Sequence, residues 1–320
     1  MTARKFFLCA ISSVALLASP AWGAWPEDKP IEVVVGFAAG GGTDLMARKL
    51  APFLQKHLGG KGQFIVVNKP GASGELANAY VAKSKPDGYT IGIVNHPAYL
   101  YVPMARKAQY QPEDFRLIAR VVDDPTVLVT RAESKVDSLQ TFLGVLKQAP
   151  GVLAVAHNGE GSNGDLMLQL LKAATGAEVN TIPYKGTGQQ KTDVLGGHVA
   201  LGTVSAGEVP ELHHGGTGPL KAIAQFTEKR SPALPNVPTA IESGVRILMS
   251  SERGFAAPKD IDPAIASRLE KAIADSLKDP VLLATAAGDA PVLSFMPGAQ
   301  WTKSLDRNSA GLKKLAEARR

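Results

Sequence analysis

Ile31-Glu32-Val33-Val34-Val35-Gly36-Phe37-Ala38-Ala39-Gly40-Gly41-Gly42-Thr43-Asp44-Leu45-Met46, residues 31–46 of the 320-residue chain, is the stretch that decides the fold. Its start is mostly apolar and indicates a short buried strand, and apolar residues recur at helical spacing from Leu45 onward. Thr43 and Asp44 suit the beginning of that helix, because a side-chain oxygen there can accept a hydrogen bond from a free backbone amide. The glycines between strand and helix predict a loop whose amides hold an anion at the helix N-terminus. A tight connection without a ligand is the alternative interpretation.

Two common nucleotide-binding motifs do not fit this loop. A P-loop needs a lysine after its last glycine, and none follows Gly42. The dinucleotide fingerprint needs the spacing G-x-G-x-x-G, which the glycines from Gly36 to Gly42 do not follow. The predicted anion is therefore not a nucleotide phosphate.

The first 23 residues (1–23) predict an export signal. Arg4 and Lys5 supply a positive start, an apolar run follows, and small residues lead to Gly23. The apolar run is shorter than the ~20 residues that a membrane-spanning helix needs. We therefore expect cleavage after Gly23 and a location in a bacterial periplasm. Cys9 is the only cysteine and lies inside the signal, so the mature chain is predicted to have neither a disulfide nor a thiol nucleophile.

The charge of the mature chain is mild. Without Arg4 and Lys5 it has 33 basic and 29 acidic residues, a formal charge of +4, and its lysines are scattered. Nucleic-acid binding calls for a basic face or for stacking aromatic residues, and the sequence shows neither. The remaining length suits two domains of ordinary size.

Two more strands with polar loops follow the first. A strand over 63–67 runs into a glycine-rich loop over 68–74 that contains Ser73, and a strand over 89–94 ends next to His96. Ligands bind at the carboxyl edge of an open parallel α/β sheet, so these loops are predicted to lie together beside a cleft. We interpret His96 as a loop residue beside the cleft and not as a catalytic base, since no partner acid can be named.

A second α/β unit is predicted further along the chain. The apolar run over 114–130 is broken by Asp123-Asp124-Pro125, which we interpret as a crossing between two domains. A second crossing is expected near residues 249–253, where Arg253-Gly254 matches the first break. A strand over 153–156 then runs into a Gly/Ser/Asn loop over 157–165, and apolar residues follow at helical spacing. This repeats the order of strand, loop and helix in the opening stretch. Two such loops are therefore expected to face each other across a cleft.

Later parts of the chain predict a third loop and a terminal helix. Strands are predicted over 179–182 and 199–204, and the first of them runs into the loop Tyr184-Lys185-Gly186. The last helix, near residues 300–319, is charged and is expected to lie on the surface. Pro52 predicts a kink or an early break in the first helix, because proline removes a backbone hydrogen bond.

No arrangement of catalytic or metal-ligating residues stands out in the sequence. The six histidines lack metal-binding spacing, and His213 and His214 are adjacent, so they point to different faces. Neither Ser73 nor Ser162 has the G-x-S-x-G spacing of a nucleophile elbow, and we interpret these serines as hydrogen-bond donors. The sequence therefore predicts no enzyme, no metal site and no cofactor.

Six motifs occur in an order that is specific to one protein family. They are V-V-G-F-A-A-G-G-G-T-D-L-M-A-R (34–48), V-N-K-P-G-A-S-G (67–74), K-P-D-G-Y-T (85–90), I-P-Y-K-G (182–186), L-G-G-H (195–198) and K-R-S-P-A-L-P-N-V-P (229–238). Together they resemble the extracytoplasmic solute receptors of tripartite tricarboxylate transporters, also called Bug-type receptors. The likeness extends from about Pro26 to the C-terminus.

The resemblance implies an α/β architecture, the type II periplasmic binding protein fold, with two α/β domains and a ligand cleft between them. Residues 24–123 and 250–320 would form domain 1, and residues 124–249 would form domain 2. It also implies a monomeric receptor that captures a small carboxylate through backbone amides and ordered water, and that delivers it to inner-membrane transporter subunits. Delivery to a membrane sensor is one alternative, and an exported enzyme on the same fold is another.

The resemblance also implies binding loops in both domains. The first loop would clamp a proximal carboxylate, the loops of the second domain would close the cleft, and residues 203–205 would contact the distal end of the ligand. The predicted ligand-binding residues are Phe37, Ala39, Gly40, Gly41, Gly42, Thr43, Asp44, Ser73, His96, Asn158, Ser162, Asn163, Tyr184, Lys185, Gly186, Thr203, Val204 and Ser205. The chain departs from the family at Val204 and Ser205, where many relatives carry an aspartate, and at Glu252, where relatives often carry an aromatic residue. Both departures bear on the predicted distal specificity.

Overall fold

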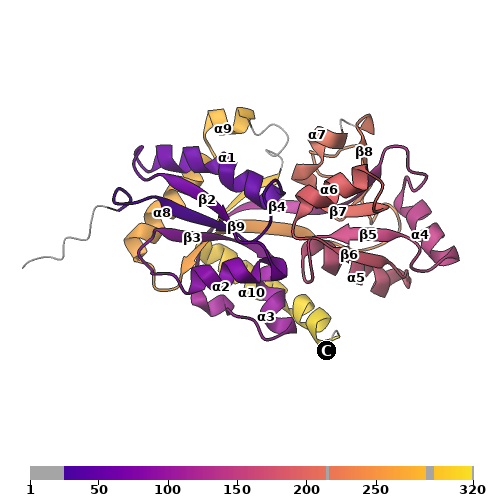
Figure 1. Cartoon of the computed structure of the whole chain (residues 1–320), viewed down its shortest axis with the longest axis horizontal. Coiled ribbons are helices and arrows are strands. Elements are labelled where there is room, and N and C mark those ends of the chain that lie inside the picture. Colours follow the sequence, from indigo (N-terminus) through magenta and orange to yellow (C-terminus); the bar gives the residue numbers. More distant parts are fainter. Residues whose placement is uncertain (1–24, 214–215, 286–291, 319–320) are drawn as a thin grey trace, which may run out of the picture.

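The computed structural model describes residues 25–213, 216–285 and 292–318 (Figure 1). The predicted signal peptide, its cleavage site and Cys9 lie outside the described residues. Within the described part of the chain, no helix is both long and apolar enough to cross a membrane.

The chain folds into two α/β halves that lie side by side, with helices on both faces of the strands (Figure 1). The strands are joined in the order β2-β1-β3-β9-β4-β7-β5-β6, and β8 and β10 each pair with β4. Their bounds are β1 (Ile31–Val35), β2 (Phe64–Asn68), β3 (Thr90–His96), β4 (Phe115–Arg131), β5 (Ala154–His157), β6 (Asn180–Pro183), β7 (Leu201–Ser205), β8 (Leu220–Gln225), β9 (Ser250–Pro258) and β10 (Leu293–Pro297).

Helices connect most of these strands. Their bounds are α1 (Gly42–His57), α2 (Glu75–Ala82), α3 (Ala98–Ala105), α4 (Leu139–Gln148), α5 (Asn163–Thr175), α6 (Thr187–Leu195), α7 (Pro210–His213), α8 (Pro263–Ser276), α9 (Pro280–Thr285) and α10 (Gly298–Glu317), with the short 3-10 turns η1 (Ala72–Gly74), η2 (Pro112–Asp114) and η3 (Ala206–Glu208).

Parallel strands at the centre of each half bring the predicted loops together. In the first half β1 pairs in parallel with β2 and β3, and in the second half β5 pairs in parallel with β6 and β7. The carboxyl ends of parallel strands meet at one edge of a sheet, which is where ligands bind in open α/β folds. The loops that follow β1, β3, β5 and β6 therefore approach one another between the halves.

Two antiparallel strands carry the chain from one half to the other. β4 is continuous through the predicted break at Asp123-Asp124-Pro125, and β9 runs beside it, with Asp124 opposite Ser251. The structure therefore has two paired strands at the places where the sequence analysis expects the two crossings, and β4 has no break at the first of them. β9 was not predicted, because Glu252 and Arg253 interrupt its apolar pattern.

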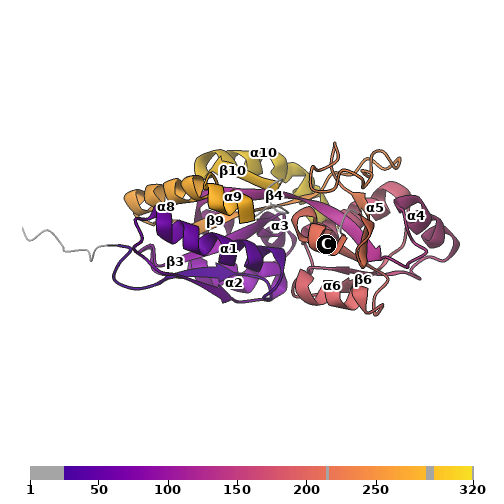
Figure 2. The ribbon, with the colours of Figure 1, turned by 90° about the horizontal axis from the view of Figure 1, so that it is seen from above.

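The C-terminal helix α10 is buried on one side. Trp301 and Leu305 are almost fully buried, and the indole Nε1 of Trp301 donates a hydrogen bond to Glu252 at 2.7 Å. The helix lies on the surface as expected, with one face packed against the core. Figure 2 shows α10 lying along β10 and β4. Its last turn reaches the second half, where Leu312 belongs to the same apolar cluster as Leu166 of α5.

The first helix does not stop at its proline. α1 continues through the exposed Pro52 as far as His57, so the predicted early break was wrong. Leu50 and Leu54 lie on its buried side and anchor the helix before and after the proline. Their burial holds the helix together although the proline removes one backbone hydrogen bond.

Candidate functional site

The same loop geometry occurs after the first strand of each half. Gly40 and Gly161 both have a positive φ (79° and 77°), a conformation that a side chain strains. The amide of Gly40 donates to Asp44 Oδ2 at 3.0 Å, and the amide of Gly161 donates to Asp165 Oδ2 at 2.7 Å. In each half an aspartate in the first turn of a helix thus holds the preceding glycine loop in shape.

Asp44 is a structural residue of the first loop. Its carboxylate is buried and also accepts hydrogen bonds from Arg48 Nε at 3.0 Å and from Asn68 Nδ2 at 2.9 Å. Burial alone would raise the pKa of Asp44, but its hydrogen bonds, the one from Arg48 first, outweigh burial and hold that pKa below its ordinary value. The side chain does not cap α1: the N-cap residue is Gly41, which has no side chain to do so.

The N-termini of three helices lie around the same space between the halves. α1 begins at Gly42 in the first half, and α5 and α6 begin at Asn163 and Thr187 in the second. The first turn of a helix has unpaired amides and carries the positive end of the helix dipole. Three such ends from two halves create a site that is suited to an anion.

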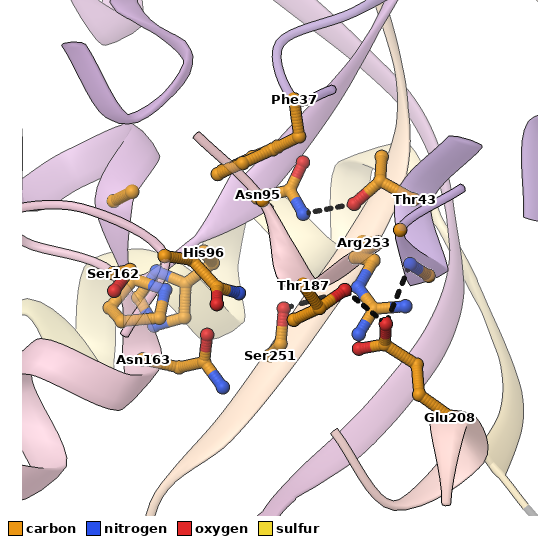
Figure 3. Close-up of a pocket in the computed structure, with 16 residues that line it drawn as sticks. Phe37, Thr43, Asn95, His96, Ser162, Asn163, Thr187, Glu208, Ser251 and Arg253 are labelled. Carbon is orange, nitrogen blue, oxygen red and sulfur yellow. Dashed lines mark hydrogen bonds between the residues drawn. The ribbon is translucent and has the colours of Figure 1, made fainter. Parts of the chain in front are cut away.

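These helix starts line a narrow cleft, which Figure 3 shows in close-up. Residues that follow β1, β3, β5 and β6 contribute to its wall, together with side chains from β9 and η3. The lining residues are Phe37, Gly41, Gly42, Thr43, Asn95, His96, Pro97, Ala98, Asn158, Ser162, Asn163, Gly186, Thr187, Glu208, Ser251 and Arg253.

Arg253 places a buried guanidinium in this cleft. Its Nη2 donates to Asp124 Oδ2 at 3.0 Å and to Ser205 Oγ at 2.6 Å, and its Nε donates to Ser251 Oγ at 3.2 Å. The two strands of the crossing and β7 therefore fix its position. Removal of one partner of such a buried ion pair is costly, because the other charge is left unpaired.

Glu208 places a carboxylate against the start of α1. Its Oε1 accepts a hydrogen bond from the amide of Gly42 at 2.8 Å and another from the hydroxyl of Thr187 (Figure 3). Its Oε2 accepts from the amide of Ser205 at 3.3 Å. Glu208 thus connects the two halves directly.

Two polar atoms of the cleft wall are buried without a hydrogen-bond partner among the described residues. They are Nδ1 of His96 and Oδ1 of Asn158, which come from opposite halves. Burial lowers the pKa of His96 to about 4, although Asp123 acts in the opposite direction, so the imidazole is neutral at neutral pH. Unpaired buried polar groups are costly, so these two atoms are suited to partners that a ligand supplies.

Half of the predicted ligand-binding residues line the cleft. They are Phe37, Gly41, Gly42, Thr43, His96, Asn158, Ser162, Asn163 and Gly186. The hydroxyl of Thr43 accepts from Asn95 Nδ2 at 2.8 Å, and the hydroxyl of Ser162 caps α5 by accepting from the amide of Asp165 at 3.3 Å. The role of these residues in binding stays a prediction.

The other predicted residues do not line this cleft, and their role in binding also stays a prediction. Ser73 Oγ donates to the carbonyl of Glu160, and the Tyr184 hydroxyl donates to Asp193 at 2.6 Å. Val204 is buried in the core. The predicted residues outside the wall are Ala39, Gly40, Asp44, Ser73, Tyr184, Lys185, Thr203, Val204 and Ser205.

Sequence analysis missed several residues of the wall. Thr187 could have been found, because it begins a helix directly after the predicted third loop. Glu208 and Arg253 could not, since their positions depend on η3 and on the unpredicted β9. Glu252 is not among the residues that line the cleft, and its carboxylate accepts from Arg120 Nη1 at 2.9 Å and from Trp301 Nε1 at 2.7 Å.

The comparisons with known proteins agree with this geometry. The Tripartite tricarboxylate transporter family receptor model matches residues 46–311. The chain is 37% identical over 289 residues to Protein BugT of Bordetella pertussis, which covers 88% of this chain and 87% of BugT. It is 33% identical over 282 residues to a UPF0065 protein of Cupriavidus necator, over 87% of this chain and 84% of that protein.

Solved structures show the same fold. The periplasmic binding protein BugD superposes with a TM-score of 0.83 at 28% identity, over 91% of this chain and 98% of BugD. R. palustris Rpa4515 with adipate gives 0.84 at 28% identity, over 92% and 97% of the two chains. MatC from Rhodopseudomonas palustris with bound malate gives 0.81 at 25% identity, over 90% and 98%. The chain therefore has the fold of the periplasmic binding proteins, and it belongs to the tripartite tricarboxylate transporter receptor family of Bug-type solute receptors.

Proposed function

We propose that this chain is a periplasmic receptor that binds a small organic carboxylate in the cleft and delivers it to the inner-membrane subunits of a tripartite tricarboxylate-type transporter. The observation that carries the proposal is the convergence of the first turns of α1, α5 and α6 beside Arg253. A carboxylate has only acceptor oxygens, so it complements helix amides, hydroxyls and a guanidinium. The adipate and malate in two structural relatives support this class of ligand.

The proposed contacts come from both halves of the molecule. Thr43 and the amides of the first turn of α1 act from one side, and Ser162, Asn163 and Thr187 act from the other. Arg253 adds a positive charge at the base. The match to a family of solute receptors favours binding without chemistry.

We further propose that the halves are domains with the boundaries 24–123 and 250–320 for domain 1, and 124–249 for domain 2. Backbone and side chains of the two domains touch around the cleft: the amide of Ala38 donates to the carbonyl of Lys185 at 3.0 Å. A ligand therefore enters only when the domains separate. Rotation about the β4 and β9 crossing provides that opening.

A thermal-shift screen of organic acids tests the proposed ligand class. A ligand that binds only the folded state raises its stability by RT ln(1 + [L]/Kd), which is about 2.7 kcal/mol at 100 times Kd. We expect at least one small carboxylate to raise the melting temperature in proportion to the logarithm of its concentration. A screen in which aliphatic, aromatic and amino acids all leave the melting temperature unchanged would refute carboxylate binding.

Delivery to a transporter needs a separate test. We expect cells that contain both the receptor and the membrane subunits to accumulate the labelled acid. Cells that lack either component should not accumulate it. Uptake that continues at the same rate without the receptor would show that its binding serves another purpose.

A further inference from the structure

We propose that Glu208 is a specificity-determining residue, which makes the receptor select one carboxylate accompanied by a hydroxyl or ammonium group over a ligand with two carboxylates. The inference rests on the proposed function, because it specifies the class of acid that the same cleft binds. It concerns the group that the ligand presents toward the α1 side of the cleft.

The carboxylate of Glu208 is a fixed part of the cleft wall. Its hydrogen bonds to Gly42, Thr187 and Ser205 come from three different elements and from both halves. A side chain held in this way does not rotate freely while the cleft is closed. A ligand therefore meets the negative charge at a defined position.

The carboxylate of Glu208 already occupies the start of α1. A Cβ atom added to Gly42 would lie 2.8 Å from Cδ of Glu208, which shows how closely the carboxyl group approaches this backbone. The amide of Gly42 is used by the protein itself. A ligand carboxylate has to bind at the remaining amides, away from Glu208.

The charges of the wall leave room for one carboxylate. Among the residues that line the cleft, Arg253 carries the positive charge and Glu208 the negative charge. The guanidinium of Arg253 is already paired with Asp124 at 3.0 Å. Lys191 Nζ lies 3.7 Å from Glu208 and offsets part of its charge, but it does not line the cleft and so offers no contact to a second ligand carboxylate there. A second ligand carboxylate would therefore face a like charge in a partly desolvated cleft.

The wall does offer spare acceptors. Oδ1 of Asn158 is buried and has no donor among the described residues, and Glu208 Oε2 has a single, long hydrogen bond of 3.3 Å. The neutral imidazole of His96 has one donor and one acceptor nitrogen, and its Nδ1 has no partner among the described residues. A hydroxyl or ammonium group can donate to such atoms, whereas an ionised carboxylate cannot.

Matched acids measured by titration calorimetry test this inference. The probes are succinate, glutarate and adipate, and for each length the acid in which a terminal hydroxyl or a terminal ammonium group replaces one carboxylate. For the wild-type chain we expect the best hydroxy or amino acid to bind at least about tenfold more tightly than the diacid of equal length. The hydroxy and amino series then show which donor is preferred.

The variant Glu208→Gln tests the effect of the negative charge of Glu208 separately from its hydrogen bonds. Glutamine keeps an acceptor oxygen for Gly42 and Thr187, so the contacts between the halves persist while the negative charge is lost. We expect the preference over the diacid to fall to about threefold or less, mainly through tighter binding of the diacid. Glu178→Gln is the matched control, because Glu178 is an exposed acid of the second half that pairs with Lys172. It should leave the preference unchanged.

The outcomes separate this inference from the proposed function. Acids that bind with no change of preference in Glu208→Gln, or a wild type that prefers the diacids, overturn the role of Glu208 alone. An equal loss of affinity for every acid in Glu208→Gln also overturns it and leaves Glu208 as a closing contact only. If no acid of any series binds the wild type, the proposed carboxylate function fails, and the inference fails with it.

Discussion

At the scale of single residues, buried aspartates hold the loops that face the cleft. Asp44 and Asp165 each accept from a glycine amide four residues earlier, and each glycine has a positive φ. Both glycine loops therefore depend on a carboxylate that does not line the cleft. The sequence predicts Asp44 as a ligand contact because it adjoins the glycines, yet its side chain serves the shape of the loop.

The stability of the folded chain should depend on pH through the buried His96. Its pKa in the folded chain is about 4, below the ordinary 6.5, so the unfolded chain takes up a proton that the folded chain excludes. The contribution of the neutral His96 to the free energy of unfolding should therefore be fully present above about pH 6.5. It should fall as the pH is lowered toward about 4, by at most about 1.4 kcal/mol per pH unit. Urea unfolding of the wild type and of His96→Gln across this window measures it. Equal pH slopes in the two proteins would contradict the burial of a neutral imidazole.

At the scale of elements, the glycines of the first loop allow the halves to touch. A Cβ atom added to Gly41 would lie 3.1 Å from Oγ1 and 3.5 Å from the amide of Thr187, in the other half. Gly41 has φ −86° and ψ 165°, which any residue adopts, so its lack of a side chain matters for space and not for conformation. A side chain at this position would therefore crowd the start of α6 against the start of α1.

Gly41→Val should prevent closure without unfolding the chain. We expect the affinity for the best organic acid to fall at least about tenfold, or about 1.4 kcal/mol, while urea stability stays close to that of the wild type. Gly144→Val is the control, since an added Cβ there meets nothing within 4 Å. Binding of the acid by Gly41→Val with unchanged affinity would show that closure of α1 against α6 is not needed.

The elements also show what a sequence can and cannot predict. β1, β5 and the loops after them follow from local patterns: apolar runs, glycines and helical spacing. β9 does not, because Glu252 and Arg253 are buried only through partners far away in the chain, Arg120 and Asp124. For the same reason Arg253 was missed as a residue of the cleft. Local patterns identify the loops of the site, whereas its charges depend on tertiary contacts.

At the scale of the whole molecule, two strands and one helix connect the halves. β4 and β9 cross side by side, and near the end of α10 Leu312 belongs to an apolar cluster that includes Leu166 of the second half. Around the cleft the loops touch directly, as Gly42 and Glu208 do. We expect the two halves to rotate about this crossing and to close on what lies between them.

Small-angle X-ray scattering should detect this rotation. We expect the radius of gyration to decrease when the chain is saturated with the best organic acid, because the ligand stabilises contacts between the halves. Gly41→Val should show a smaller decrease at the same saturation. An identical scattering curve with and without the acid would contradict a closing motion.

Titration calorimetry of the best acid and of its uncharged amide tests the central claim most directly. The claim is that helix N-termini from both halves, with Arg253, hold a carboxylate in the cleft. We predict one acid bound per chain, and an amide of equal size that binds at least about a hundredfold more weakly, a difference of about 2.7 kcal/mol. Equal affinities for the acid and its amide would contradict the account, because the cleft would then not recognise the negative charge.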